Sequence, residues 1–102
     1  LPDPPTAIFY FNDQIALQAY DLFREEGIRV PQDLSVLAVD NIPEADRANP
    51  GLSTFNHPKE LMGKLAAEIM LNQLGPYPER SRYGVTLRTP LVRRGSVAPP
   101  KA

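Results

Sequence analysis

An uninterrupted apolar segment near the start of the chain restricts the possible folds most. Residues 7–11 read AIFYF, and the apolar run stops at Asn12 and Asp13. A strand that is apolar at every position, rather than at alternate positions, is typical of a parallel sheet covered on both faces. We therefore predict a strand over residues 7–11 that is buried on both faces.

A helical pattern follows this strand, and a second apolar segment follows the helix. The pattern runs from Gln14 to Glu26, and Gly27 supplies the stop signal. The segment SVLAV at 35–39 then ends at Asp40. Strand, helix and strand in this length predict a βαβ unit with a parallel pair of strands. The expected core face of the helix consists of Ile15, Ala16, Ala19, Tyr20, Leu22 and Phe23.

The remaining segments give a less regular pattern. A helix over 59–74 is apolar around most of its circumference, so we expect it to have neighbours on more than one side. Residues 83–96 predict one or two strands interrupted by Pro90. Three shorter predictions are a loop over 41–51 with one helical turn from Pro43, a strand over 52–55 and a loop over 76–82.

Composition narrows the class of protein. The chain has 102 residues, which is enough for one small domain. Its formal net charge of −1 provides no basic field for nucleic acid. We interpret the two adjacent arginines at 93–94 as a solvated strand end rather than a nucleic-acid patch. The absence of cysteine excludes disulfide, zinc-finger and thiol-nucleophile sites. There is no apolar run of membrane-spanning length, and the chain starts at Leu1 without methionine, so we expect a piece of a longer protein without a membrane partner.

Polar residues end both predicted strands. Asn12 and Asp13 follow the first strand, and Asp40 follows the second. We expect Asp13 to cap the helix, which needs only one such side chain. This leaves Asn12 and Asp40 at the carboxyl ends of parallel strands, where open sheets bind ligands. For Asp40, a simple turn role in the sequence DNIP fits the pattern equally well.

Longer blocks of sequence carry a family resemblance. In order, the blocks are NDQIALQAY, GIRVPQDLSVLAVDNIP, LSTFNHP and TPLVRRGS. Their sequence, order and spacing closely resemble the LacI/GalR family of bacterial transcription regulators over nearly the whole chain, from about residue 6 to 96. The resemblance is to the C-terminal part of the family's effector-binding core.

The resemblance implies a fold and a division of the chain. It predicts an α/β fold with a Rossmann-like parallel sheet and flanking helices, as part of a type I periplasmic-binding-protein-like fold that holds its ligand between two subdomains. Residues 1–56 would belong to the C-terminal subdomain, and residues 57–96 would return to the N-terminal one. The tail at 97–102 is predicted to be disordered.

The same resemblance implies three ligand-binding positions. Asn12 and Asp40 match the family's cleft asparagine and aspartate, which hydrogen-bond polar effector groups. His57 lies where the chain crosses between subdomains, a position at which many relatives have glutamine. Its alternative roles are to cap the helix after Pro58 or to act as a solvated hinge residue. The implied effector is small and polar, such as a sugar or sugar derivative, and neither a cofactor nor a metal is expected.

The resemblance also implies partners and a location. Family dimers use the first helix and the loop that matches residues 44–49, and Leu17 lies away from the expected core face. A single exposed leucine arises equally well by chance. We expect a homodimer or higher oligomer in the cytoplasm that reaches operator DNA only through an N-terminal domain absent here. The predicted interface residues are Leu17, Asp21, Arg24, Glu44 and Ala48.

The sequence offers little support for an enzyme. It has no nucleophile elbow, no phosphate-binding loop and no metal-ligand spacing around its single histidine. Asp13, Asp40 and His57 could form an acid–base set, but nothing places a nucleophile or oxyanion site beside them. We therefore predict a protein that is not an enzyme. The alternatives are part of a periplasmic-type solute-binding protein and, less favoured, an enzyme fragment.

We predict that this chain alone does not bind operator DNA specifically, because its net charge of −1 gives phosphates no attraction. Any binding should be weak, independent of sequence and lost at moderate salt. A gel-shift assay at ~150 mM salt, with operator and scrambled duplexes, measures this. Sequence-selective retention by the chain would contradict the prediction.

Overall fold

The computed structural model describes residues 2–76 and 83–101. The loop predicted over 76–82 therefore lies, beyond its first residue, outside the described part of the chain. The chain divides into two compact units. The first combines Leu1–Asn56 with Pro90–Ala102, and the second is His57–Thr89.

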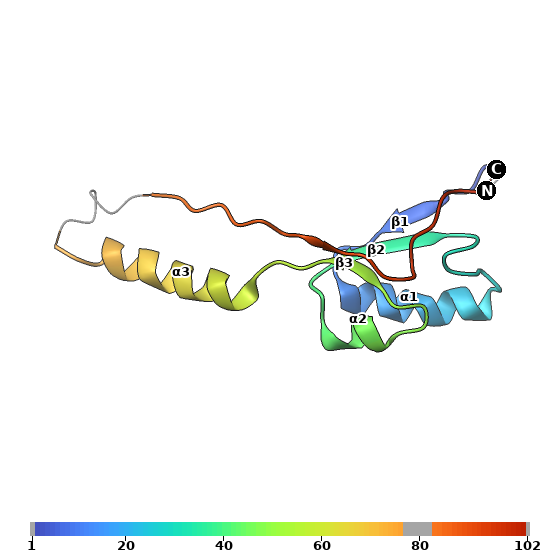
Figure 1. Cartoon of the computed structure of the whole chain (residues 1–102), viewed down its shortest axis with the longest axis horizontal. Helices are drawn as coiled ribbons and strands as arrows, with labels where there is room; N and C mark the ends of the chain where they lie inside the picture. Colours follow the sequence, from blue (N-terminus) through green and yellow to red (C-terminus); the bar gives the residue numbers. More distant parts are fainter. Residues whose placement is uncertain (1, 77–82, 102) are drawn as a thin grey trace. The chain divides into compact units, whose positions relative to one another are not determined.

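The first unit is built on a mainly parallel sheet (Figure 1). Its strands lie in the order β1 (Ala7–Phe9), β2 (Ser35–Val39), β3 (Ser53–Phe55) and β4 (Leu91–Val92). The pairs β1–β2 and β2–β3 are parallel, and β3–β4 is antiparallel. The predicted α/β class with a parallel sheet is thus confirmed.

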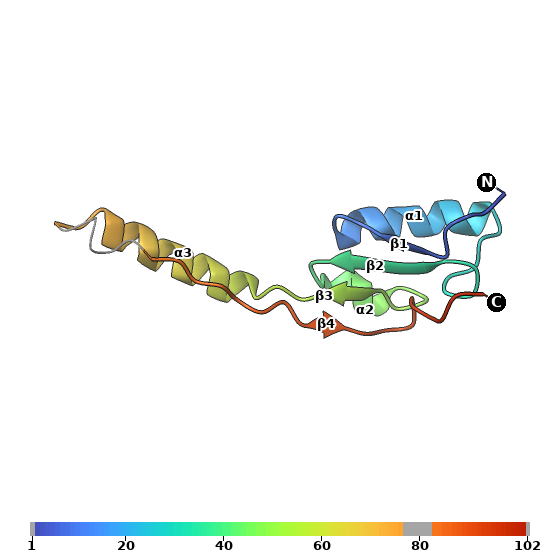
Figure 2. The same ribbon diagram turned by 90° about the horizontal axis from the view of Figure 1, so that it is seen from above.

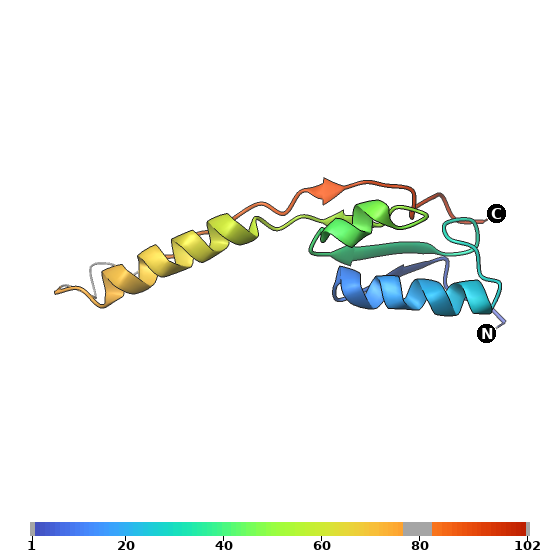
Figure 3. The ribbon, with the colours of Figure 1, turned by 90° about the horizontal axis from the view of Figure 1, so that it is seen from below.

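Two helices cover the same face of this sheet. Helix α1 (Asp13–Glu25) lies against β1 and β2, and the short helix α2 (Pro43–Arg47) lies beside it under β3 (Figures 2 and 3). The predicted helix and the predicted turn from Pro43 are both present. The buried core between helices and sheet consists of Ala16, Tyr20, Val36, Ala38, Ala45 and Leu52.

The end of α1 follows its sequence signals closely. Gly27 has a positive φ of 71°, which glycine adopts without strain. The Ile28 N–H then donates to the carbonyl of Phe23 at 2.8 Å, as in a Schellman motif. The core face of the helix, in contrast, is narrower than predicted. Ile15 and Leu22 are 42% and 61% exposed, because only the stripe that includes Ala16 and Tyr20 reaches the sheet.

The opposite face of the sheet is mainly apolar and is exposed at its two edge strands, where Phe9 and Leu91 are 59% and 50% exposed. Strand register places Phe9 beside Leu37, Val39 beside Phe55, and Phe55 beside Leu91. We call these five residues the outer sheet face. The Phe9 ring meets that of Phe55 edge-on at 6.2 Å. The prediction that the first strand is buried on both faces is therefore wrong for this chain, because both helices lie on one side.

The C-terminal segment is ordered and belongs to the first unit. The Ala98 N–H donates to the Ser35 hydroxyl, which donates in turn to the Ala98 carbonyl, both at 3.0 Å. Lys101 forms an ion pair with Asp33. Arg29 and Lys101 hold the pKa of Asp33 well below its usual range. Predicted disorder over 97–102 is therefore wrong for the described part, 97–101, and the second unit ends at Thr89 rather than at residue 96.

The second unit consists of one helix and an extended segment. Helix α3 (Lys59–Gln73) buries none of its residues, and Leu71 is 69% exposed. Residues 83–89 form no regular strand, so of the predicted C-terminal strands only β4 is present in the described residues. The apolar groove between helix and segment is lined by His57, Pro58, Met62, Leu65, Ala66, Ile69, Val85, Leu87 and Thr89.

We predict that the isolated chain associates into a homodimer or larger species. The outer sheet face and α3 expose apolar surface, and burial of such surface contributes roughly 25 cal/mol per Å². Exchange of α3 or of the C-terminal strands between copies is one route to this association. Light scattering on a sizing column measures the mass.

A charged variant tests which surface is responsible. Phe9→Asp should reduce the measured mass of the associated species, because it places a charge on the outer sheet face. The control Gln18→Asp places the same charge at an exposed polar position of α1 and should leave that mass unchanged. A single wild-type species at 11.3 kDa, with a thermal midpoint independent of concentration, would contradict the prediction.

Candidate functional site

The candidate site lies where the parallel strands end. The Tyr10 N–H donates to the Leu37 carbonyl at 2.8 Å, which continues the pairing of β1 and β2 to their carboxyl ends. The Asp40 N–H donates to the Phe55 carbonyl at 2.9 Å and so attaches the end of β2 to β3. Asn12 and Asp40 therefore follow adjacent strands at the same edge of the sheet, as predicted.

Asn12, rather than Asp13, caps α1. Its Oδ1 accepts a hydrogen bond from the Ile15 N–H at 2.9 Å, and its backbone is extended, as an N-cap requires. The prediction that Asp13 caps the helix is wrong. Capping uses only the Oδ1 of the half-buried Asn12 side chain. Its Nδ2 donates to none of the residues that the structure describes, which leaves a donor at the sheet edge.

Asp13 has a different role, because its side chain is fully buried. Its Oδ1 accepts from the Thr54 hydroxyl at 2.5 Å and its Oδ2 from the Ile42 N–H at 3.0 Å. A buried carboxylate is tolerated when its oxygens have donors of this kind. The start of α1, strand β3 and the loop after β2 are thus joined at one carboxylate. The only sequence signal for this structural role of Asp13 was that Asn12 and Asp13 can both cap a helix, while one cap is enough.

The backbone at Asp40 and Asn41 is unusual. Both residues have positive φ, at 138° and 59°, and neither is glycine. Such conformations store about 1–3 kcal/mol each and persist only where surrounding contacts enforce them. The Asn41 N–H donates to Thr54 Oγ1 at 3.3 Å, and Asp40 is half-buried. The backbone after β2 is therefore held in a defined turn beside Asp13 and β3.

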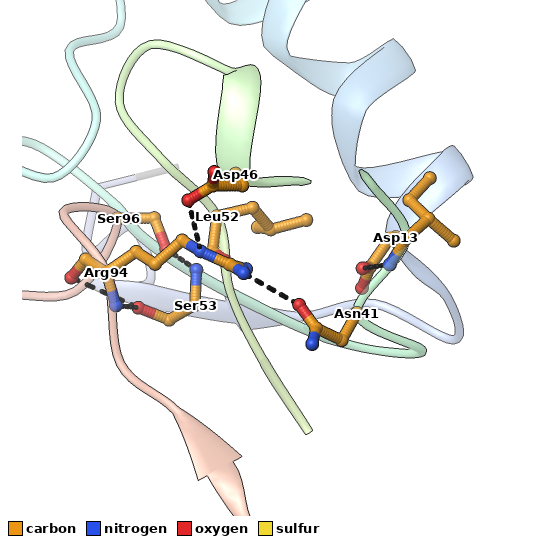
Figure 4. A network of polar contacts seen from close by, with 8 residues as sticks. Asp13, Asn41, Asp46, Leu52, Ser53, Arg94 and Ser96 are labelled. Atoms are coloured by element: carbon orange, nitrogen blue, oxygen red, sulfur yellow. Dashed lines mark hydrogen bonds and ion pairs between the residues drawn. The ribbon is translucent and has the colours of Figure 1, made fainter. Parts of the chain in front are cut away.

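Arg94 holds the same turn from the other side. Its Nη2 donates to Asn41 Oδ1 at 2.7 Å and its Nη1 to the Leu52 carbonyl at 2.8 Å (Figure 4). Its Nε lies 3.4 Å from a carboxylate oxygen of Asp46, and the Arg94 side chain is only 16% exposed. Arg93 is exposed. The prediction of a solvated strand end is thus right for Arg93 and wrong for Arg94, since charge alone does not show which arginine turns inward.

His57 is the first residue of the second unit. It is half-buried, and its Nδ1 lies 3.4 Å from Met62 Sδ on the first turn of α3. Its backbone directly precedes Pro58, the N-cap position of that helix, which makes no side-chain capping bond. These contacts lie within the second unit, and the ligand role of His57 stays a prediction.

The predicted interface residues come from α1 and α2. A surface groove there is lined by Gln14, Leu17, Gln18, Asp21, Ile42 and Glu44. Arg24 contacts Asp21 at 3.3 Å, and Ala48 packs against the core. Leu17 is half-buried and also touches the core, so its position is less exposed than the helical wheel indicated. The role of these residues in an interface between copies stays a prediction.

Two further kinds of feature are absent from the described residues. No group of three or more histidine, cysteine, aspartate or glutamate side chains within 2–76 and 83–101 is arranged to hold a metal ion. Among the same residues, no helix combines the length and apolar character that crossing a membrane requires.

Comparison with known proteins gives the family. Residues 1–97 match the periplasmic binding protein-like domain. The chain is 43% identical over 97 residues to the HTH-type transcriptional repressor PurR of Vibrio atlanticus, with 95% of this chain and 29% of that protein covered. It is 39% identical over 93 residues to the ribose operon repressor of Haemophilus influenzae, with 91% and 28% covered.

Solved structures agree with these relatives. A LacI family transcriptional regulator from Enterococcus faecalis V583 with bound ribose superposes with a TM-score of 0.86 at 31% identity, over 97% of this chain and 37% of that one. A dimeric Lac repressor gives 0.78 at 28% identity, over 95% and 35%. The chain belongs to the periplasmic binding protein-like domain family, in the form found in LacI-type regulators. It spans about 29% of the PurR relative's length, and these relatives are repressors and regulators rather than enzymes.

We predict that Asp13→Ala destabilises the chain by about 3 kcal/mol, because the Thr54 hydroxyl and the Ile42 N–H both lose their buried acceptor. Urea unfolding at a fixed protein concentration measures the change. The control Asn12→Ser keeps a helix cap and should stay within about 0.5 kcal/mol of the wild type. Equal effects of the two substitutions would contradict the structural role given to Asp13.

Proposed function

We propose that this chain is part of the effector-binding core of a LacI/GalR-type DNA-binding transcriptional regulator. The longer protein would bind a small polar effector, with a sugar or sugar derivative favoured, and reach operator DNA through a domain outside this chain. It would act in the cytoplasm as a homodimer or higher oligomer. Leu17, Asp21, Arg24, Glu44 and Ala48 would contribute to the interface between copies.

One observation carries the proposal. Asn12 and Asp40 follow adjacent parallel strands at the carboxyl edge of the sheet. The chain that contains this sheet superposes over 97% of its length on a regulator with bound ribose. Sheets of this kind bind ligands at that edge. Asp40 also stands in a positive-φ backbone that several hydrogen bonds maintain, and such strain is found at functional sites.

The chemistry of the candidate residues fits a polyhydroxylated ligand. A carboxylate at Asp40 accepts hydrogen bonds from hydroxyl groups, and the Asn12 Nδ2 donates to a hydroxyl or ring oxygen. His57 is the third position for which the family resemblance implies a ligand contact, and its imidazole can donate or accept a hydrogen bond. Solved relatives with named ligands carry ribose, cellobiose and lactose, which makes these sugars the first probes.

The proposed mechanism is a shift between two arrangements of the subdomains. A ligand changes that equilibrium only as far as it binds one arrangement more tightly than the other. The dimer would transmit the shift to the DNA-binding domain, so that effector and operator affinities are coupled. A periplasmic-type solute-binding protein with the same fold is the alternative. A secretory signal upstream in the gene would favour that alternative, and a helix-turn-helix segment would favour the regulator.

We predict that Asp40→Ala in the longer protein abolishes the effector response and leaves operator affinity largely unchanged. A charged hydrogen bond of this kind contributes about 1.5–3 kcal/mol, and a hydroxyl-rich ligand would make more than one. Operator binding titrated against effector, by fluorescence anisotropy, measures both quantities. Asn12→Ser, which keeps the helix cap, should weaken the response less because an amide bonds more weakly than a carboxylate.

The control for Asp40→Ala is Glu25→Ala. Glu25 is an exposed carboxylate in the last turn of α1, far along the helix from Asn12. Its removal changes the net charge by the same amount without altering the sheet edge. A dose-response in Asp40→Ala equal to that of Glu25→Ala would refute the ligand role of Asp40.

A further inference from the structure

The turn that carries Asp40 has an unusual backbone. Asp40 and Asn41 both have positive φ, which asparagine and aspartate adopt more readily than other non-glycine residues but still at a cost that neighbouring contacts offset. The backbone contacts come from one side, through Thr54 and the Phe55 carbonyl. The side chain of Asn41 needs a separate partner, and Arg94 provides it.

Two hydrogen bonds hold the Arg94 guanidinium in place for its contact with Asn41. The guanidinium donates to Asn41 Oδ1 at 2.7 Å and to the Leu52 carbonyl at 2.8 Å, so the two bonds together fix its plane. Figure 4 shows the Arg94 side chain beside Leu52 and Ser53 with its guanidinium turned to Asn41. Its stem passes over Gly51, where an added Cβ would lie 3.2 Å from Arg94 Cδ. The glycine therefore leaves room for the arginine stem.

The segment that carries Arg94 is also linked, through backbone hydrogen bonds, to both places where the chain passes between the units. The Asp40 N–H bonds to the Phe55 carbonyl, just before the first crossing at Asn56. The Asn56 N–H donates to the carbonyl of Pro90 at 2.8 Å, just after the second crossing. Arg94 follows Pro90 on the same segment and returns to Asn41. The turn, both crossings and the C-terminal segment thus form a closed ring of contacts.

From this geometry we propose that Arg94 is a positioning residue for the Asp40 carboxylate. It holds the Asp40–Asn41 turn through Asn41 Oδ1 and fixes the turn to the segment that returns from the second unit. The inference rests on the proposed function in one respect, namely that Asp40 contacts the effector. The local part, that Arg94 enforces the turn, is independent of any ligand.

The local part is tested by amide hydrogen exchange on the chain itself. Arg94→Met keeps the length of the stem and removes the donors, so protection at the amides of Asp40, Asn41 and Ile42 should fall about tenfold, or about 1.4 kcal/mol. Amides remote from the turn, such as Ile28, should change by less than twofold. The matched control is Arg93→Met, since Arg93 is the exposed neighbour.

The outcomes of this measurement are distinct. Equal loss of protection at Ile28 and at Asn41 in Arg94→Met would show a general stabilising role and overturn the proposal. Asn41→Ala, which removes only the acceptor, provides a second variant should Arg94→Met fail to fold. Because the two side chains would act as one contact, the double variant should exchange no faster than the more affected single variant.

The ligand part is tested in the longer protein with ribose, cellobiose and lactose as probes, by titration calorimetry with whichever sugar binds. Arg94→Met should weaken binding about tenfold, and Arg94→Lys should not restore it, because one ammonium cannot replace the two-pronged guanidinium contact. When the two substitutions are combined, Arg94→Met should cause no loss of affinity beyond that of Asp40→Ala alone, since no carboxylate is left to misplace.

The two proposals fail in different ways. Unchanged affinity in Arg94→Met, with affinity lost in Asp40→Ala, would overturn the role of Arg94 and leave the proposed function intact. Unchanged affinity in Asp40→Ala would refute the effector site. In that case, or if none of the sugars binds, the exchange rates at Asn41 still decide whether Arg94 enforces the turn.

Discussion

The arrangement of the first unit depends on the buried carboxylate of Asp13. An ionised group without solvent is very unfavourable unless donors surround it, and here the Thr54 hydroxyl and the Ile42 N–H meet its two oxygens. One donor belongs to β3 and the other to the loop after β2. The first turn of α1, the middle of the sheet and that loop must therefore assemble together. The position of the candidate ligand residues on either side, Asn12 and Asp40, follows from this contact.

Serine hydroxyls perform a second structural task, which is to hold the C-terminal segment where strand pairing is short. The Ser53 Oγ accepts from the Arg94 N–H at 2.8 Å, and the Ser96 Oγ accepts from the Ser53 N–H at the same distance. Ser96 also donates to the Val36 carbonyl at 2.6 Å, and Ser35 bonds both backbone groups of Ala98. Because β4 contains only Leu91 and Val92, these hydroxyls replace ladder bonds and bring Arg94 back to the turn.

The exposed edges of the outer sheet face and the narrow core face of α1 have a common cause. Strand β1 is apolar at every position, yet both helices of the unit lie on one side of the sheet (Figure 2), so Phe9 and Leu91 of the outer sheet face are exposed. Ile15 and Leu22 are partly exposed because they lie beside the stripe of α1 that contacts the sheet. Apolar surface of this extent is typical of a site of association. The chain spans about 29% of its PurR relative, so the relatives have further segments beyond the region compared.

Sequence alone determined the elements and their class. Continuous apolar runs at 7–11 and 35–39, with a helical pattern between them, predicted the parallel pair, and Gly27 marked the helix end correctly. The blocks around Asn12 and Asp40 predicted the family, which the comparisons confirmed. Tertiary structure alone decided which of Asn12 and Asp13 caps the helix, which arginine of the pair at 93–94 is buried, and where the C-terminal segment runs. The physical reason is that local propensity ranks residue types by their own backbone, whereas a buried polar side chain is placed by donors and acceptors from distant segments.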